Sequence, residues 1–337
     1  MAERATKTTI LVAGLGSIGR RHARLISERD DTELLVCDPV EQFVSETQSQ
    51  LHRPAAGTFA DYDDALGAAP DVVFVCTPNH LHVPMGLQAV AAGADLMVEK
   101  PIAHDLAEAR RLIDAVESAG RFCHVGYMLR FDPALRKIER MVREDAVGEL
   151  VGGRAMIGTY ITLLNARSPD RERQPNALIV DYTHELDFLR WIFGDIARVV
   201  AAGATRGRME KLARPNVFQM ILTMASGALV NVHMDYVQYP QRRVLDVFGD
   251  RGTLSYDFMT GQVRRFRYGA THQWESLDEP PLTTRVDDLH RNQIASILSG
   301  RADGLAPVVS GRDGLAALAA ADAAIRAAET ERPVALA

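Results

Sequence analysis

The stretch TTILVAGLGSIG, residues 8–19, decides how the first third of the chain folds. An apolar run typical of a strand leads into GLGSIG, which fits G-x-G-x-x-G, and the following run at 19–28 has helical character. Glycines in this pattern permit a tight turn and let the backbone approach a pyrophosphate at the positive end of the helix. The pattern alone is a weak signal, but between a strand and a helix it predicts a dinucleotide-binding βαβ unit.

An acidic residue stands where such a unit places its ribose-binding carboxylate. Asp38 ends the apolar run ELLVCD, 19 residues after Gly19, and a carboxylate there accepts hydrogen bonds from an adenosine ribose. Pro39 and Val40 are not basic, so NAD is favoured over NADP. The alternative is that the glycines only form a turn and Asp38 only ends a strand. We expect cofactor contacts at Asp38 and along the loop, at Gly14, Gly16, Ser17, Ile18 and Gly19.

Strand and helix patterns alternate up to about residue 127 and then change. Strand-like runs at 71–78, 95–100 and 121–127 are separated by helical runs, which predicts an open parallel sheet. Beyond them come a long strand at 148–161, one helix at 180–194, and strand pairs joined by tight turns between 216 and 258, which predict antiparallel pairing.

The predicted fold is therefore α/β with two domains. A Rossmann domain with a doubly wound parallel sheet takes residues 7–127, and an α/β domain with a mainly antiparallel sheet takes residues 128–337. Two helices at about 286–299 and 311–329 close the chain, and they can pack on either domain.

Composition excludes several classes of protein. A net charge of −6 argues against a nucleic acid or an anionic membrane as partner, and no apolar run approaches the ~18 residues of a membrane span. The three cysteines, Cys37, Cys76 and Cys123, lie in or beside apolar runs without metal-ligand spacing. We expect them to be reduced core residues of a cytoplasmic protein, and we expect no metal site. The motifs of serine hydrolases, zinc proteases and P-loop enzymes are absent from the sequence.

Polar motifs follow two further strands of the predicted parallel sheet. TPNHLH, residues 77–82, and EKP, residues 99–101, both come at the carboxyl end of a strand, where ligands of such sheets bind. We expect cofactor contacts from Thr77, Pro78, Asn79, His82 and Glu99. The alternative for the first motif is that Asn79 or His80 only caps the next helix.

Lys100 is the most informative residue of these motifs. At the end of its strand it is expected near the nicotinamide, where a lysine can hold or accept the proton of a reacting hydroxyl. The alternative is a solvated lysine beside a turn proline.

The motif DYTHELD, residues 181–187, places Asp181, His184 and Asp187 three residues apart in the predicted helix. Residues at this spacing are neighbours on a helix surface, and a carboxylate can orient an imidazole that relays a proton. The alternative is a histidine that is satisfied within the core, because Leu186 and Phe188 are apolar.

Taken in order, GLGSIGRRH, Asp38, CTPNHLH, EKPIA, GYMLRFDPAL and DYTHELDFLRWIFG resemble the Gfo/Idh/MocA family, that of glucose–fructose oxidoreductase and inositol dehydrogenase. The match runs from about Thr8 to Leu336. The resemblance implies an N-terminal Rossmann domain and a C-terminal domain whose open sheet makes an oligomer interface, in a homodimer or homotetramer. It also implies NAD(P)-linked oxidation or reduction of a sugar, a cyclitol or a sugar derivative.

The resemblance also implies roles for single residues. Lys100 matches the catalytic lysine, whose peptide bond to the following proline is often cis in the family, and His184 matches the catalytic histidine. The family's acid often lies four residues before that histidine, where this chain has Val180, so Asp181 is expected to fill its place. Met128 and Arg130 match positions that line the nicotinamide pocket. Substrate contacts are expected from Lys100, Asp181, His184, Tyr160 and Tyr236, with Arg167 and Tyr239 as further candidates.

On this hypothesis, Lys100 and His184 hold the reacting hydroxyl, and His184 with Asp181 takes its proton as hydride passes to NAD. Two rivals stay open. Some relatives use a tightly bound NAD only transiently, as lyases or hydratases, and a few are sensors that bind NAD(P) and a partner protein. The presence of Lys100, His184 and Asp181 together disfavours a sensor.

Overall fold

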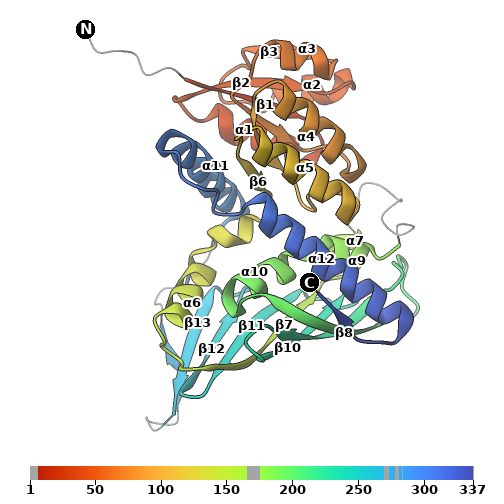
Figure 1. Cartoon of the computed structure of the whole chain (residues 1–337), viewed down its shortest axis with the longest axis vertical. Coiled ribbons are helices and arrows are strands. Elements are labelled where there is room, and N and C mark those ends of the chain that lie inside the picture. Colours follow the sequence, from red (N-terminus) through yellow and green to blue (C-terminus); the bar gives the residue numbers. More distant parts are fainter. Residues whose placement is uncertain (1–6, 165–174, 269–272, 278–280, 283, 337) are drawn as a thin grey trace. The chain divides into compact units, whose positions relative to one another are not determined.

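The structure is a computed structural model that describes residues 7–164, 175–268, 273–277, 281–282 and 284–336. Its contacts divide the chain into two compact units (Figure 1). The first consists of Met1–Phe131 with Arg285–Leu318, and the second of Asp132–Thr284 with Ala319–Ala337. Helix α11 (Val286–Asp303) and the start of helix α12 (Gly311–Thr330) therefore belong to the first unit.

The first unit contains a six-stranded sheet in which every pair is parallel, in the order β3-β2-β1-β4-β5-β6. The predicted doubly wound sheet is confirmed. The order reverses between β1 and β4, which is the point where such sheets bind ligands. The strands are β1 (Thr8–Ala13), β2 (Thr32–Cys37), β3 (Gly57–Phe59), β4 (Val72–Val75), β5 (Asp95–Val98) and β6 (Cys123–Val125).

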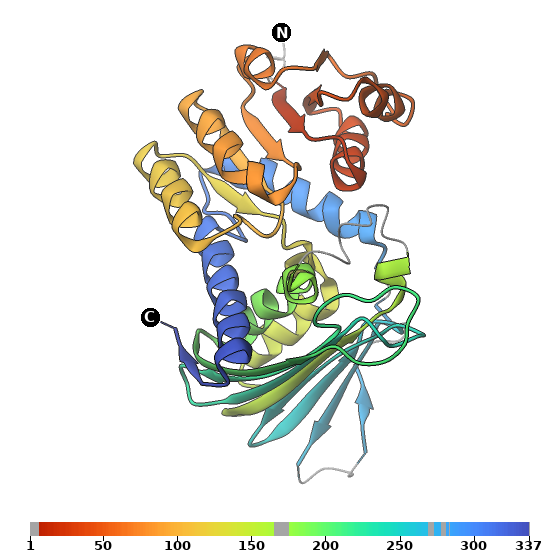
Figure 2. The ribbon, with the colours of Figure 1, turned by 90° about the vertical axis from the view of Figure 1, so that its right-hand side faces the viewer.

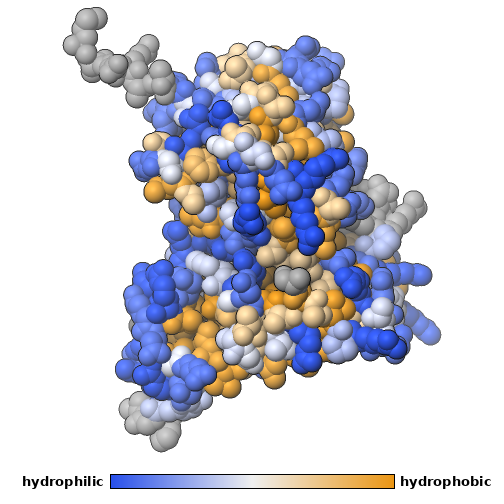
Figure 3. All heavy atoms as spheres, in the orientation of Figure 1, coloured by the Kyte–Doolittle hydropathy of each residue, from blue (hydrophilic) through white to orange (hydrophobic). Residues whose placement is uncertain are grey.

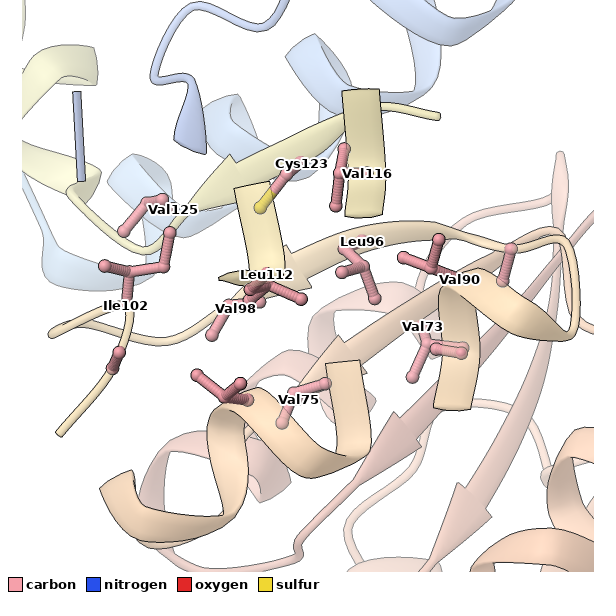
Figure 4. Packing of buried hydrophobic residues seen from close by; sticks show 14 of the residues in the cluster. Val73, Val75, Val90, Leu96, Val98, Ile102, Leu112, Val116, Cys123 and Val125 are labelled. Carbon is pink, nitrogen blue, oxygen red and sulfur yellow. The ribbon is translucent and has the colours of Figure 1, made fainter. Parts of the chain in front are cut away.

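Helices bury both faces of this sheet. Val73 and Val75 of β4 belong to one apolar cluster with α4 and α5, as Figure 4 shows, while Val72 and Phe74 belong to a second cluster with α1 and α11. Because both faces are covered, β4 is apolar without alternation, as the sequence predicted. The helices of the first part of the chain are α1 (Ser17–Ser27), α2 (Glu41–Gln48), α3 (Tyr62–Gly67), α4 (His82–Ala91) and α5 (Leu106–Ser118), with 3₁₀ helices η1 (Asn79–Leu81) and η2 (Met128–Phe131).

The second unit is built on a nine-stranded sheet in the order β14-β13-β12-β11-β7-β10-β9-β8-β15. Only β7 and β10 pair in parallel, so the predicted, mainly antiparallel sheet is confirmed for the strands that the structure describes. The strands are β7 (Leu150–Gly158), β8 (Ile196–Ala204), β9 (Val217–Met224), β10 (Leu229–Asp235), β11 (Arg242–Gly249), β12 (Gly252–Asp257), β13 (Gln262–Arg267), β14 (Glu275–Ser276) and β15 (Val334–Ala335).

The two faces of this sheet differ. A row of paired residues on one face is buried and consists of Met220, Val232, Ala155, Leu245 and Tyr256. Helices α6 (Pro133–Arg143), α9 (Ala177–Asp181) and α10 (Thr183–Phe193) lie over that face (Figure 2). The adjacent row, which starts with Val200 and Ile221, faces the other way, and no helix of the described residues covers it. In Figure 3 hydrophobic residues also gather in the middle of the second unit, between hydrophilic ones at its sides.

Several details of the prediction are wrong. The single helix expected at 180–194 is broken at Tyr182, whose φ of −107° and ψ of 30° separate α9 from α10. Asp181 and His184 therefore do not share one helix. The strand expected at 95–100 ends at Val98, so Glu99 and Lys100 lie in the turn beyond it. The sequence also did not predict α2, α6, β3 or β8.

Two further expectations concern the chain as a whole. Each of the three cysteines is buried and none is in a disulfide, as expected of core residues. Among the helices that the structure describes, none combines the length and apolar character needed to cross a membrane.

Candidate active site

The glycine loop joins β1 to α1, and its three glycines differ in their surroundings: Gly14 and Gly19 are closely packed, whereas Gly16 is open. Gly14 has a φ of +88°, and a Cβ there would lie 2.8 Å from the carbonyl group of Cys76. A Cβ on Gly19 would lie 1.8 Å from the Gly14 carbonyl oxygen. Both glycines are therefore required by the packing of the loop itself. Gly16, in contrast, has no neighbouring atom within 4 Å of a Cβ position, so its backbone faces open space that another molecule can approach.

The start of α1 is suited to an anion. Gly16 is its N-cap, no side chain caps the helix, and the first turn carries no acid, so its backbone N–H groups and the helix dipole are not neutralised locally. Ser17 is exposed and Ile18 is half-buried on this turn. The Thr77 hydroxyl, in the loop after β4, is buried and has no hydrogen-bond partner within the described part of the chain. These features fit a dinucleotide whose pyrophosphate lies over the loop.

Asp38 lies directly after β2, as predicted, and is nearly buried at 7% exposure. Its Oδ2 accepts a hydrogen bond from the Leu15 N–H at 2.7 Å, and its Oδ1 accepts one from the Val40 N–H at 2.9 Å. Each carboxylate oxygen has two acceptor sites, so ribose hydroxyls can still be bound. Asp38 thus fixes the glycine loop and remains suited to the ribose.

The loop after β4 is tied to the turn after β5 by His82. This ring is 1% exposed, with Nδ1 2.8 Å from the Pro101 carbonyl oxygen and Nε2 2.9 Å from the Thr77 carbonyl oxygen. Both nitrogens therefore lie against backbone carbonyl oxygens, so His82 joins these two turns, and its contact with a cofactor stays a prediction. Pro78 is exposed, and Asn79 is half-buried in η1, so both lie at the surface of this loop.

Lys100 is half-buried in the turn after β5, on the same edge of the sheet as the glycine loop. The peptide bond between Lys100 and Pro101 is cis, as the resemblance implied. Glu99 beside it is 9% exposed, and its Oε1 lies 2.9 Å from Nε2 of His22 in α1. Burial alone would raise the pKa of Glu99, but the hydrogen bond and charge of His22 and the charges of His290 and Lys100 outweigh burial and lower it.

Met128 and Arg130 lie in η2, directly after β6 and Gly126. Met128 is half-buried. The Arg130 guanidinium is nearly buried, and its Nη2 donates to Asp313 Oδ1 of α12 at 3.3 Å, within the same unit. Arg130 thus anchors η2 to the beginning of α12, a contact that the sequence did not indicate.

In the second unit, Asp181 ends α9 and His184 lies in the first turn of α10. Tyr236 is fully buried and its hydroxyl donates a hydrogen bond to Asp181 Oδ2. The tyrosine predicted to contact substrate therefore lies behind the acid and holds its carboxylate. His184 is 7% exposed. Close by, the buried carboxylate of Glu185 accepts a hydrogen bond from Nε of Arg243 at 2.8 Å.

The remaining candidates have different surroundings. The Tyr160 hydroxyl accepts a hydrogen bond from the backbone N–H of Lys211 at 3.0 Å, and its ring is half-buried. Tyr239 is 73% exposed. Arg167 lies outside the described residues.

Sequence reasoning missed His22, His290 and Arg243. A signal for His22 existed, because it stands three residues after Gly19 in α1. Both residues lie on the buried stripe of that helix, with Ala23 and Ile26. His290 and Arg243 carry no motif, and only the fold brings them to their partners.

Comparison with known proteins agrees with this geometry. The chain is 29% identical over 328 residues to inositol 2-dehydrogenase of Paracoccus denitrificans, a match that covers 94% of this chain and 93% of that protein. A levoglucosan dehydrogenase solved with NADH and L-sorbose has the same fold, with a TM-score of 0.88 and 17% identity over 98% of this chain and 99% of its own. An oxidoreductase from Agrobacterium radiobacter, solved with NAD+, L-tartaric acid and magnesium, has a TM-score of 0.86 and 19% identity over 98% of each chain.

Two family models account for most of the chain. Residues 8–127 match the NAD-binding Rossmann fold of an oxidoreductase family, and residues 167–336 match its C-terminal α/β domain. With a glycine loop after β1, a carboxylate directly after β2 and a lysine in the turn after β5, the chain belongs to the Gfo/Idh/MocA family of NAD-binding oxidoreductases.

Proposed function

We propose that this protein is an NAD-dependent dehydrogenase that oxidises a secondary hydroxyl of a cyclitol or sugar. The observation that carries the proposal is the placement of Lys100 after β5, on the edge of the sheet where the open glycine loop follows β1. The inositol 2-dehydrogenase of Paracoccus denitrificans, similar over almost the whole chain, supports a cyclitol as the substrate class.

The proposed roles follow from the chemistry of each side chain. A bound nicotinamide supplies the hydride acceptor. The Lys100 ammonium holds the reacting hydroxyl, and His184 takes its proton. Asp181 orients the imidazole and is itself held by Tyr236. Tyr236 is therefore a positioning residue in this proposal.

A steady-state assay tests these roles. Turnover is followed by the absorbance of NADH, with a panel of cyclitols, aldoses, uronates and nucleotide sugars. Lys100→Ala and His184→Ala should each lower kcat by about 10² or more, while NAD affinity measured by calorimetry stays within a few-fold. His104→Ala, an exposed residue near Lys100 in the sequence, is the matched control. Near-normal turnover in both variants would refute the assignment.

The same assay distinguishes a dehydrogenase from the two alternative functions, a lyase or hydratase and a sensor. A lyase or hydratase that uses NAD transiently returns the hydride in each cycle, so it releases no net NADH. Steady NADH release in proportion to substrate consumed supports a dehydrogenase. A sensor would bind NAD tightly and turn over none of the panel.

We further propose NAD rather than NADP as the cofactor. Asp38 carries its carboxylate directly after β2, where we expect the ribose hydroxyls, and a 2′-phosphate there would meet a like charge. Asp38→Ser should weaken NAD binding and narrow the preference for NAD over NADP. A wild-type protein that binds NADP more tightly than NAD would refute this.

The open face of the nine-stranded sheet supports a homo-oligomer. Val200, Ile221 and Leu229 are 41%, 46% and 54% exposed on three neighbouring strands, which is a large apolar area for a surface. We propose that a second copy covers this face, in a dimer or tetramer. Light scattering after size exclusion should give at least twice the mass of one chain. Ile221→Lys with Leu229→Lys should lower that mass, and a monomeric wild-type protein would refute the proposal.

A further inference from the structure

Three side chains from distant parts of the sequence meet beneath the turn that carries Lys100. They are His22 of α1, Glu99 after β5 and His290 of α11, and their ligand-type atoms all lie within 4.8 Å of one another. All three belong to the first unit and are nearly buried. We propose that His22, packed against His290, holds the Glu99 carboxylate in place, and that this carboxylate in turn positions Lys100 and keeps it charged. The inference rests on the role proposed above for Lys100.

The contacts of Glu99 occupy both of its oxygens. Oε1 lies 2.9 Å from Nε2 of His22, and Oε2 accepts the backbone N–H of Lys100 at 3.3 Å. On the far side, a Cβ on Gly126 would lie 2.7 Å from Oε2, so a glycine is needed there to leave room for the carboxylate. The carboxylate is thus held from α1 and from its own turn, and β6 gives it space.

The imidazole of His22 is itself held on two sides. Its ring packs edge-on against Phe74 of β4 at 5.3 Å between centroids, and against His290 at 5.1 Å. His290 is fixed by a 2.8 Å contact of its Nδ1 with the Val286 carbonyl oxygen. Because Nδ1 donates in that contact, the neutral ring keeps its Nε2 as an acceptor on the side of the cluster.

Helix α11 is attached to α1 by ion pairs, so His290 stays against His22. Asp287 pairs with Arg24 and with Arg21, the latter at 3.1 Å, and Arg291 pairs with Glu28 at 3.0 Å. A segment almost 200 residues beyond Glu99 therefore completes the support of the turn.

The charges around Glu99 favour an ionised carboxylate. Burial lowers the pKa of His290 to about 4, so this ring is neutral at pH 7. Cys76 and His82 also face Glu99, and burial raises the pKa of the thiol and lowers the pKa of the imidazole, which leaves both neutral. The charges that act on the carboxylate and lower its pKa come from His22, His290 and Lys100. The carboxylate therefore favours the ammonium form of Lys100.

A metal ion held by two histidines and a glutamate is the competing interpretation of these residues. The direct contact of His22 with Glu99 argues against it, because a hydrogen bond at 2.9 Å already satisfies both atoms.

The test compares variants of the protein that remove either the His22–Glu99 hydrogen bond or the charge of Glu99. His22→Leu removes the donor to Glu99, His22→Gln keeps a donor, and Glu99→Gln removes the charge at nearly constant shape. His52→Gln, an exposed histidine of the same unit, is the control. The primary measurement needs neither cofactor nor substrate: the rate of reductive methylation of Lys100 against pH, followed by mass spectrometry of the peptide that contains it.

In Glu99→Gln we expect the methylation profile to move to lower pH, with about tenfold faster labelling at pH 8, because the loss of a neighbouring opposite charge moves an ionisation midpoint by about one unit or more. His22→Leu should move the profile in the same direction, because the carboxylate loses the donor that holds it near Lys100. His22→Gln should lie close to wild type. With substrate, kcat should fall in the first two variants.

Unchanged labelling in both His22→Leu and Glu99→Gln would overturn the inference. Stoichiometric metal in the purified wild-type protein that is lost in His22→Leu would overturn it as well, in favour of a metal site. If His22→Leu does not fold, Glu99→Gln decides alone. Failure of the proposed function is separate: Lys100→Ala would then keep turnover, while the labelling profile would still report on the support of the turn.

Discussion

Gly16 and Gly19 of the glycine loop should respond differently to substitution by alanine, which adds one methyl group. A Cβ on Gly19 would lie 1.8 Å from the Gly14 carbonyl oxygen and 2.9 Å from the Gly14 carbonyl carbon, and neither backbone atom can move without opening the loop. Overpacking of this kind costs about 1–3 kcal/mol or more. We therefore expect Gly19→Ala to lower the free energy of unfolding by at least about 2 kcal/mol.

Gly16→Ala, in contrast, should leave the free energy of unfolding nearly unchanged and weaken NAD binding. No atom lies within 4 Å of its Cβ position, and its φ of −64° suits alanine. The change in unfolding free energy should stay within about 1 kcal/mol, because the gain from a stiffer unfolded chain opposes the weaker N-cap. NAD affinity should fall about tenfold or more, since the methyl group enters the space left for the pyrophosphate. Urea denaturation without NAD and calorimetric titration with NAD measure the two effects. A Gly16→Ala protein that binds NAD normally, or a Gly19→Ala protein of normal stability, would refute this division of tasks.

Three further predictions concern stability and reactivity. Arg243→Ala should lower the unfolding free energy by about 3 kcal/mol in urea, because it removes one charged partner of the buried Glu185 carboxylate. Arg243→Met combined with Glu185→Leu should recover most of the loss. None of the three buried cysteines should react with a thiol reagent at pH 8 before unfolding, because burial raises the pKa of each. His124 and His290 have pKa values lowered to about 4 by burial. The unfolded chain takes up their protons first as pH falls, so stability should drop between about pH 6.5 and pH 4, by about 3 kcal/mol for each. A urea midpoint that stays constant over this window would contradict the last prediction.

Local patterns predicted the parallel sheet well because each βα unit there is short and complete. The apolar run at 71–78, the helix after it and the glycine loop each specify their own structure, and the right-handed crossover leaves few ways to join them. The nine-stranded sheet is different. Hairpin turns predicted its neighbouring strands β9 with β10 and β11 with β12. Nothing local indicated that β7 lies between β10 and β11, since that pairing joins residues far apart in the sequence.

The site of the second unit was predicted by motif, but its geometry was not. Helical spacing placed Asp181 and His184 on one helix, whereas the chain breaks at Tyr182 and the acid ends a separate helix. What fixes Asp181 is the hydroxyl of Tyr236, 55 residues further on, at the end of β10. A spacing argument considers only neighbours in the sequence and cannot find such a partner.

The histidines of the first unit show why a residue type near a motif does not by itself indicate chemistry. His82 stands in a motif at the ligand-binding edge, and the expectation was a contact with the cofactor. In the fold both of its nitrogens face backbone carbonyls of the loops after β4 and β5. His22 follows the glycine motif and supports Glu99 from the other side of the same turn. Lys100 stands between these two supports, so its position depends on two buried histidines. Buried polar groups need partners: His82 finds them in the turns after β4 and β5, and Nε2 of His22 finds its partner in Glu99.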